Sequence, residues 1–107
     1  MVRPLEGVRI LDLTSGPAGG IATMILADFG AEVLMIERPG IDPMMALPAS
    51  RMWRRGKRTL PLDLSTEDGL ATLDDLCSGA DVLICNWRFA ALLRKRLDYA
   101  SLHARHP

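Results

Sequence analysis

Short apolar runs alternate along this chain with longer stretches of helical periodicity. Four runs have the branched aliphatic composition of β-strands: residues 8–14, 32–37, 59–64 and 81–85. The continuous apolar centre of the second run favours a parallel strand that is covered on both faces. Pro61 lacks the N–H that a ladder hydrogen bond needs, so the third run is predicted to lie at a sheet edge.

Helical patterns separate or follow these runs. Residues 18–29 have an apolar face so wide that we expect a buried helix ending at Gly30; the face carries Ile21, Met24, Ile25 and Phe29. Residues 65–68 fit a capping box that opens a second helix, which Ser78 and Gly79 end. A very basic helical stretch begins near Phe89.

The segment from Pro39 to Gly56 has no periodicity and contains Pro43 and Pro48, which predicts a long surface loop of a functional or mobile kind. Elsewhere strand and helix alternate. This alternation predicts one α/β domain with a Rossmann-like parallel sheet and flanking helices.

Charge and cysteine content exclude several classes of function. Thirteen basic residues balance thirteen acidic ones, so no overall field draws the chain to nucleic acid or to a membrane surface. No apolar run approaches the roughly twenty residues of a membrane span. Cys77 and Cys85 have no zinc spacing and no secretory leader precedes them, which predicts a reduced, cytoplasmic setting. His103 and His106 have no partner ligand, and we expect neither a metal site nor a nucleophilic triad.

Chemistry-bearing residues follow the predicted strands. The loops after parallel strands open on one edge of a sheet, where α/β folds bind ligands, so four segments are expected to converge on a nucleotide-like ligand: residues 15–20, Arg38, residues 63–65 and residues 86–88. The spacing of Gly16, Gly19 and Gly20 departs from the dinucleotide fingerprint and favours a tight turn with close helix packing. Arg38 either binds a ligand or pairs with Glu37.

Two basic clusters have open interpretations. Five of the eight residues 51–58 are basic: Arg51, Arg54, Arg55, Lys57 and Arg58. They either hold phosphates or form a solvated loop. Trp53 lies within the run and favours the ligand interpretation, because its ring offers a face to a ligand. Residues 94–96 form a second patch, with a solvated helix face as the alternative. Trp87 is predicted to be a lid on the core rather than a stacking platform.

Several motifs, in register over nearly the whole chain, resemble the opening of class III CoA-transferases, the CaiB/BaiF family. The motifs are PLEGVRILDLT at residues 4–14, ADFGAEV at 27–33, IERPG at 36–40, RGKRTL at 55–60, LDL at 62–64, ADVLI at 80–84, NWR at 86–88 and LDY at 97–99. Members of this family move coenzyme A between carboxylic acids, and relatives such as α-methylacyl-CoA racemases invert a centre next to the thioester.

The resemblance implies a coenzyme A site at the predicted strand ends. The positions that match the family's CoA contacts are Pro17, Ala18, Arg38, Leu62, Asp63, Leu64, Ser65, Asn86, Trp87, Arg88 and Arg94. The chain departs from the family where Pro-Gly usually follows the Asn-Phe-Arg motif, because it has Phe89 and Ala90. It also has Arg96 where a glycine usually precedes Leu-Asp-Tyr.

The resemblance also places the acylated aspartate of the transferases beyond residue 107, so no catalytic residue is assigned. We therefore expect residues 1–107 to be the incomplete, N-terminal CoA-binding part of a CoA-transferase that acts on acyl-CoA. The alternatives are the corresponding part of an acyl-CoA racemase, or a non-catalytic remnant or adaptor. The predicted sheet edge and the family's habit suggest a homodimer or association with the rest of the fold.

Overall fold

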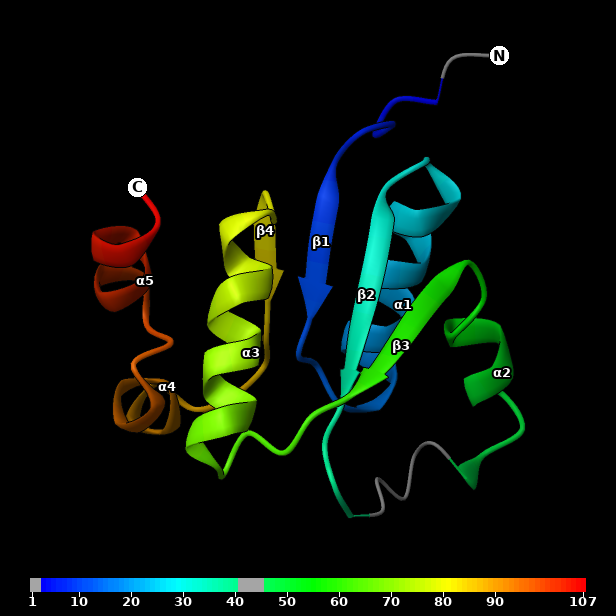
Figure 1. Cartoon of the computed structure of the whole chain (residues 1–107). Helices are drawn as coiled ribbons and strands as arrows, with labels where there is room; N and C mark the ends of the chain where they lie inside the picture. The colour runs from blue at the N-terminus through cyan, green and yellow to red at the C-terminus, as the bar shows by residue number, and fades with distance from the viewer. Residues whose placement is uncertain (1–2, 41–45) are drawn as a thin grey trace.

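The computed structural model describes residues 3–40 and 46–107, and its centre is a four-stranded parallel sheet (Figure 1). The strands are β1 (Arg9–Asp12), β2 (Glu32–Glu37), β3 (Lys57–Pro61) and β4 (Val82–Ile84). Their order in the sheet is β3-β2-β1-β4, so β3 and β4 are the edges. The predicted α/β class, the parallel sheet and the edge position of the strand with Pro61 are confirmed.

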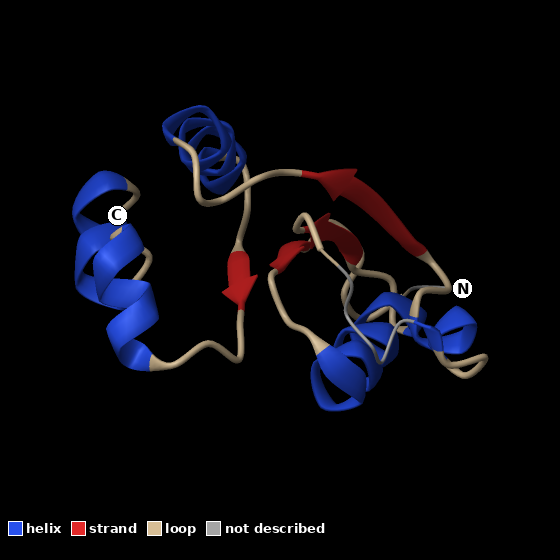
Figure 2. Cartoon of the chain, turned by 90° about the horizontal axis from the view of Figure 1, so that it is seen from below, coloured by secondary structure: helices blue, strands red, loops and turns tan. Residues whose placement is uncertain are grey.

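Helices cover both faces of this sheet (Figure 2). They are α1 (Gly16–Asp28), α2 (Ser50–Trp53), α3 (Glu67–Ser78), α4 (Phe89–Lys95) and α5 (Tyr99–Arg105). Helices α1 and α2 lie on one face, α3 lies on the other, and α4 and α5 lie beside α3. None of the helices in the described part of the chain is long and apolar enough to cross a membrane.

Alternate residues of β1 supply two separate apolar clusters, because successive side chains of a strand point to opposite faces. Leu11 belongs to the larger cluster, which includes Leu73 of α3 and Leu97. Ile10 belongs to the smaller one with Val33, against which Leu26 of α1 packs. Each fully buried aliphatic side chain contributes about 1.5–3 kcal/mol, so β1 stabilises both layers.

The predicted start of the second helix is confirmed, and its cap is Thr66. The Thr66 hydroxyl accepts a hydrogen bond from the Gly69 amide at 3.0 Å, which satisfies one of the free N–H groups of the first turn. A Cβ on Gly69 would collide with the carbonyl oxygen of Asp63. The start of α3 is therefore packed tightly against the turn that follows β3.

Two predictions about the first half of the chain are wrong. The helix predicted to be buried, α1, leaves Ile21 41%, Ile25 45% and Phe29 51% exposed. Only the opposite side of α1 meets the sheet, so its wide apolar face exceeds what the described residues cover. The predicted surface loop of residues 39–56 contains the one-turn helix α2, in which Trp53 is only 8% exposed. Pro43 and its neighbours in residues 41–45 lie outside the described residues.

The basic C-terminal stretch forms two helices rather than one. Helix α4 ends at Arg96, whose φ of 57° is in the left-handed region that favours glycine. Arg96 is the one non-glycine residue with positive φ among residues 3–40 and 46–107. The turn lets α5 fold back on α3, where Arg105 Nε donates to Asp74 Oδ1 at 2.9 Å.

Replacing Arg96 with glycine is expected to raise the free energy of unfolding by about 0.5–1 kcal/mol, because glycine adopts positive φ without a Cβ clash. Urea denaturation of the 107-residue chain measures the change. Arg94→Gly is the matched control: the same exchange within the helical part of α4 is expected to cost about 1 kcal/mol. Equal losses in both variants would contradict the account.

Candidate functional site

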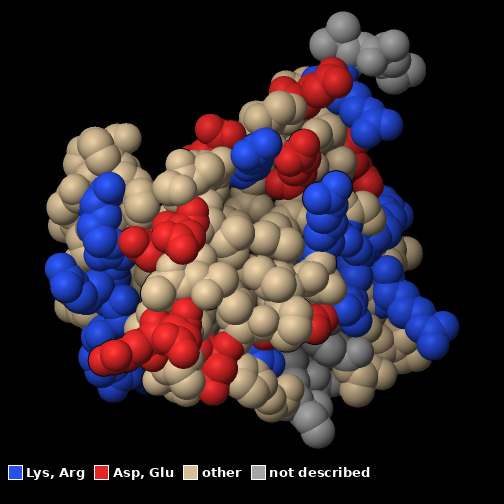
Figure 3. Space-filling model, in the orientation of Figure 1, with Lys and Arg blue, Asp and Glu red and all other residues tan. Residues whose placement is uncertain are grey.

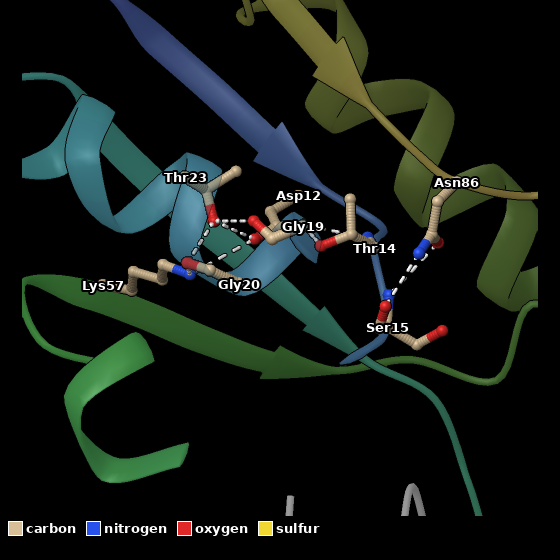
Figure 4. A network of polar contacts seen from close by, with 8 residues as sticks. All are labelled: Asp12, Thr14, Ser15, Gly19, Gly20, Thr23, Lys57 and Asn86. Atoms are coloured by element: carbon tan, nitrogen blue, oxygen red, sulfur yellow. Dashed lines mark hydrogen bonds and ion pairs between the residues drawn. The ribbon is translucent and has the colours of Figure 1, made fainter. Parts of the chain in front are cut away.

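A buried carboxylate lies at the carboxyl end of the central strand β1. Asp12 is 0% exposed and is the hub of a polar network (Figure 4). Its Oδ1 accepts hydrogen bonds from the Thr14 amide at 2.8 Å and from the Thr14 hydroxyl at 2.6 Å. Its Oδ2 accepts a bond from the Thr23 hydroxyl of α1 at 2.6 Å. Asp12 thus fixes the start of the loop that leads from β1 into α1.

Lys57, the first residue of β3, supplies the counter-charge. Its Nζ lies 3.5 Å from Asp12 Oδ2, and the exposed fractions of the two side chains are 0% and 1%. The ammonium also donates to the carbonyl oxygen of Gly20 in α1 at 3.0 Å. The ion pair therefore joins β1, α1 and β3 in the interior.

Burial sets the protonation of this lysine. Removal of the ammonium from water lowers the pKa of Lys57 below its ordinary value, and the Asp12 carboxylate opposes that effect only in part. A buried lysine with a lowered pKa that is bonded to a carboxylate is costly to build, and its neighbours must stay in place to keep it charged. The network consequently needs α1 and β3 in fixed positions.

The glycines after β1 permit this close packing. A Cβ on Gly19 would collide with the side chain of Thr14, and one on Gly20 would lie 3.2 Å from the Trp53 Cβ. Gly16 has a φ of 82°, which residues with a Cβ rarely adopt. The interpretation of these glycines as a tight turn with close helix packing is confirmed.

A second pair of bonds links the loop after β1 to Asn86, just after the end of β4. The Asn86 Nδ2 donates a hydrogen bond to the carbonyl oxygen of Ser15 at 2.7 Å. The Asn86 Oδ1 accepts a hydrogen bond from the Ser15 amide at 3.2 Å. The chain builds the sheet from β1 through β2 to β3 in one direction and then adds β4 on the other side of β1, so the strand order reverses between β1 and β4. A reversal of strand order is where open α/β sheets bind ligands.

The guanidinium of Arg38 reaches across the same edge. Arg38 directly follows β2, and its Cζ lies 4.5 Å from the centroid of the Trp87 ring, which follows β4. The Trp87 Nε1 donates to the carbonyl oxygen of Leu13 at 3.1 Å. Glu37 instead pairs with Arg54 at 2.7 Å. The alternative pairing of Arg38 with Glu37 is therefore not what the structure contains.

The basic side chains of residues 51–58 lie in different environments. Lys57 is buried, and Arg54 binds Glu37. Arg55 forms two bonds to Asp28 of α1, which raise the pKa of Arg55 and lower that of the carboxyl. Figure 3 shows one group of basic side chains on the side of the molecule that carries α2 and β3, and another on the side that carries α4 and α5.

Trp53, predicted to offer a face to a ligand, packs against Gly20 of α1 and is almost fully buried. Trp53 also lines a cavity of about 420 Å³, which extends from the buried ion pair to the ends of β1 and β2. Arg38 and Ser15 line this cavity, whereas residues 63–65 and 86–88 do not. The four predicted segments hence share an edge of the sheet but not one cavity.

The remaining predicted residues lie around this edge. Pro17 and Ala18 are in the first turn of α1, and Arg88 precedes α4. Arg94 is exposed and lies in the last turn of α4. In the turn after β3, Leu62 is partly buried and Leu64 is buried, while Asp63 accepts two bonds from Ser65 that lower the pKa of its carboxyl.

Sequence reasoning missed the buried network of Asp12, Thr23 and Lys57. One signal was available, because Asp12 is an acid between Leu11 and Leu13 in a run that otherwise predicts a buried strand. No signal marked Lys57, which lies in a run of basic residues. Among residues 3–40 and 46–107, no group of histidine, cysteine, aspartate and glutamate side chains could hold a metal ion.

Comparison with known proteins gives a consistent result. The sequence profile described as CoA-transferase family III matches residues 5–107. Succinyl-CoA–D-citramalate CoA-transferase from Chloroflexus aurantiacus is 36% identical over 98% of this chain and 29% of its own length. Human alpha-methylacyl-CoA racemase is 36% identical over 96% of this chain and 26% of its own length.

A solved structure agrees with these sequence matches. The crystal structure of a CAIB/BAIF family protein from Brucella suis superimposes with a TM-score of 0.88 at 31% identity, over 100% of this chain and 32% of that one. The chain thus spans less than a third of the length of each of these three proteins.

Breaking the buried ion pair is expected to destabilise the fold. Asp12→Asn and Lys57→Met should each lower the free energy of unfolding by about 3–5 kcal/mol, because each leaves a buried partner without its counter-charge. The double variant should lose much less than the sum of the single losses. The exposed pair Asp28 and Arg55 is the matched control, for which a double-mutant cycle should give a far smaller coupling. Additive losses at Asp12 and Lys57 would contradict the account.

The stability of the chain should also depend on pH through Lys57. Its folded pKa is lowered, so between that pKa and the unfolded value of 10.5 the unfolded state binds more protons, and stability rises with pH. Measured between about pH 7 and about pH 10, the free energy of unfolding of the wild type is expected to rise relative to that of Lys57→Met. A difference that stays constant or falls would contradict the direction of the shift.

Proposed function

Because this chain belongs to CoA-transferase family III, we propose that its 107 residues form the N-terminal CoA-binding part of a transferase. In this proposal the enzyme moves coenzyme A between carboxylic acids through acyl-CoA thioesters. The proposal assigns no catalytic residue to the chain, and it concerns the binding of CoA and acyl-CoA alone.

One observation carries the proposal: Arg38, Trp87 and Asn86, from the ends of β2 and β4, gather where the strand order reverses. Coenzyme A carries phosphates and an adenine ring. A guanidinium is suited to phosphate because its N–H groups match the spacing of phosphate oxygens, and an aromatic or guanidinium plane is suited to a base. The residue types at this edge therefore fit the ligand.

The remaining contacts of the proposed site come from three neighbouring segments. The first turn of α1 lies at the same edge, and the N-terminus of this 13-residue helix has a partial positive charge that favours phosphate. The turn after β3 borders the edge, because the Leu62 amide donates to the carbonyl oxygen of Glu37 at 2.9 Å. We propose as CoA contacts, besides Arg38 and Asn86, the residues Pro17, Ala18, Leu62, Asp63, Leu64, Ser65, Arg88 and Arg94. Trp87 belongs to the proposed site through its contact with Arg38.

A racemase is the second candidate, and the 36% identity with the human alpha-methylacyl-CoA racemase favours it. Both functions use the same ligand class, so the CoA site is common to them. They differ in what happens to the acyl group: a racemase exchanges the proton next to the thioester, whereas a transferase changes the acid that carries CoA. A non-catalytic adaptor would bind CoA and do neither.

Association is a further part of the proposal. The outer edge of β4 is unpaired in the described sheet, and its Val82 is 40% exposed. Unpaired strand edges favour pairing with another chain or segment. We propose that a second copy, or the rest of the family's fold, covers this edge.

Coenzyme A is expected to bind the purified chain with a dissociation constant in the micromolar range, which corresponds to about 8 kcal/mol. Arg38→Ala should weaken binding about tenfold or more, because it removes a charged donor to phosphate. Isothermal titration calorimetry at low and moderate salt measures both, and the effect of salt should be smaller in the variant.

Arg58→Ala is the matched control, since Arg58 is an exposed arginine of β3 that borders a surface hollow at the amino end of the sheet. It should leave the affinity unchanged. Failure of a demonstrably folded chain to bind coenzyme A would sink the proposal that these residues bind it by themselves. Equal effects of the two arginine variants would show general charge attraction in place of a site.

A further inference from the structure

The contact between Arg38 and Trp87 spans the sheet. Arg38 follows β2 and Trp87 follows β4, and β1 lies between these two strands. The contact would be loose if either side chain rotated freely. Trp87 does not, because its Nε1 donates to the carbonyl oxygen of Leu13 at the end of β1 and its ring packs against the larger apolar cluster.

Leu13 is itself held in place. Its amide donates to the carbonyl oxygen of Ile84 in β4 at 2.8 Å, and its side chain is 2% exposed. The indole is therefore anchored to the sheet at the junction of the central strand with β4. An aromatic ring with a bonded N–H and one buried side is a fixed platform.

The contact with Trp87 is the main interaction of the Arg38 guanidinium among the described residues. Arg38 is exposed, and within residues 3–40 and 46–107 no hydrogen bond or ion pair of its guanidinium is found. The adjacent carboxylate of Glu37 is occupied by Arg54 at 2.7 Å. Among the described residues, the contact with the indole face is the interaction that positions the guanidinium.

A guanidinium stacked on a ring uses its face and keeps its N–H groups, which lie in its own plane, for other acceptors. We infer that Trp87 is a positioning residue, which holds Arg38 across the end of β1 with its N–H groups ready for a phosphate of the ligand. This inference rests on the proposed CoA site and extends it. It differs from both sequence interpretations of Trp87, as a lid on the core and as a platform for the ligand's base.

The contact with Trp87 is expected to increase the affinity for the ligand, because it orders the Arg38 side chain before binding. An arginine that is already held in its binding conformation loses less side-chain freedom when the phosphate arrives. Trp87 then contributes to affinity through Arg38 alone. The effects of removing the two side chains are expected to be non-additive.

Tryptophan fluorescence tests the contact without any ligand. The chain has two tryptophans, so the Trp53→Phe background isolates the emission of Trp87. Arg38→Ala in that background should change the intensity or wavelength of the emission, whereas Arg58→Ala should not. An emission that is unaffected by Arg38→Ala would overturn the inference, whatever the chain binds.

Calorimetric titration with coenzyme A tests the role of the contact. Trp87→Leu should weaken binding about two- to fivefold, the equivalent of an exposed cation–π contact, and Trp87→Phe should restore most of the affinity. Trp87→Leu combined with Arg38→Ala should bind no more weakly than Arg38→Ala alone. Phe89→Leu, which replaces a nearby ring that is 66% exposed, should have no effect.

The possible results separate the two proposals. Additive losses in the double variant would overturn the positioning role and favour direct contact of Trp87 with the ligand. Absence of CoA binding in the folded wild type would refute the proposed function. It would also refute the role of Trp87 in binding, even if fluorescence shows the contact between Arg38 and Trp87. Circular dichroism of each variant confirms that the fold is intact.

Discussion

The buried ion pair between Asp12 and Lys57 is the interaction on which the rest of this structure depends. Transfer of two charges to the interior is expensive, and it is tolerated only where each charge finds its partner and additional hydrogen bonds. Here the additional bonds come from Thr14, Thr23 and the carbonyl oxygen of Gly20. One carboxylate thereby holds the central strand, the following loop, the first helix and the edge strand β3 in one arrangement.

The ligand-binding edge inherits its shape from that arrangement. The loop after β1 is held by Asp12 on one side and by Asn86 on the other, so it has little freedom of its own. The carbonyl oxygen of Leu13, directly before that loop, in turn fixes the indole of Trp87. The short segment of residues 12–15 thus connects the buried network around Asp12 with the contacts of Asn86 and Trp87 at the sheet edge.

Sequence patterns predicted much of this fold, for identifiable physical reasons. The parallel sheet follows from apolar runs that alternate with helical stretches, and the edge position of β3 follows from the missing N–H of Pro61. What the pattern lacked was information on partners. The apolar face of α1 carries Ile25 whether or not another surface covers it, and Lys57 resembles its solvated basic neighbours until the position of Asp12 is known. The candidate site was predictable as an edge, because strand ends converge by geometry. Its contacts were not, since hydrogen bonds such as those between Asn86 and Ser15 need distances.

The junction of β1 with β4 has a consequence for how the chain folds. Asp81 binds the amide of Arg9, Asn86 binds Ser15 and Trp87 binds Leu13 across 72, 71 and 74 residues of sequence. Contacts between such distant segments form slowly, because the intervening chain must lose its freedom before the contact can stabilise anything. The ligand edge is therefore assembled late, after nearly the whole segment has left the ribosome. Until then the central strand β1 has one side open to pairing with other chains.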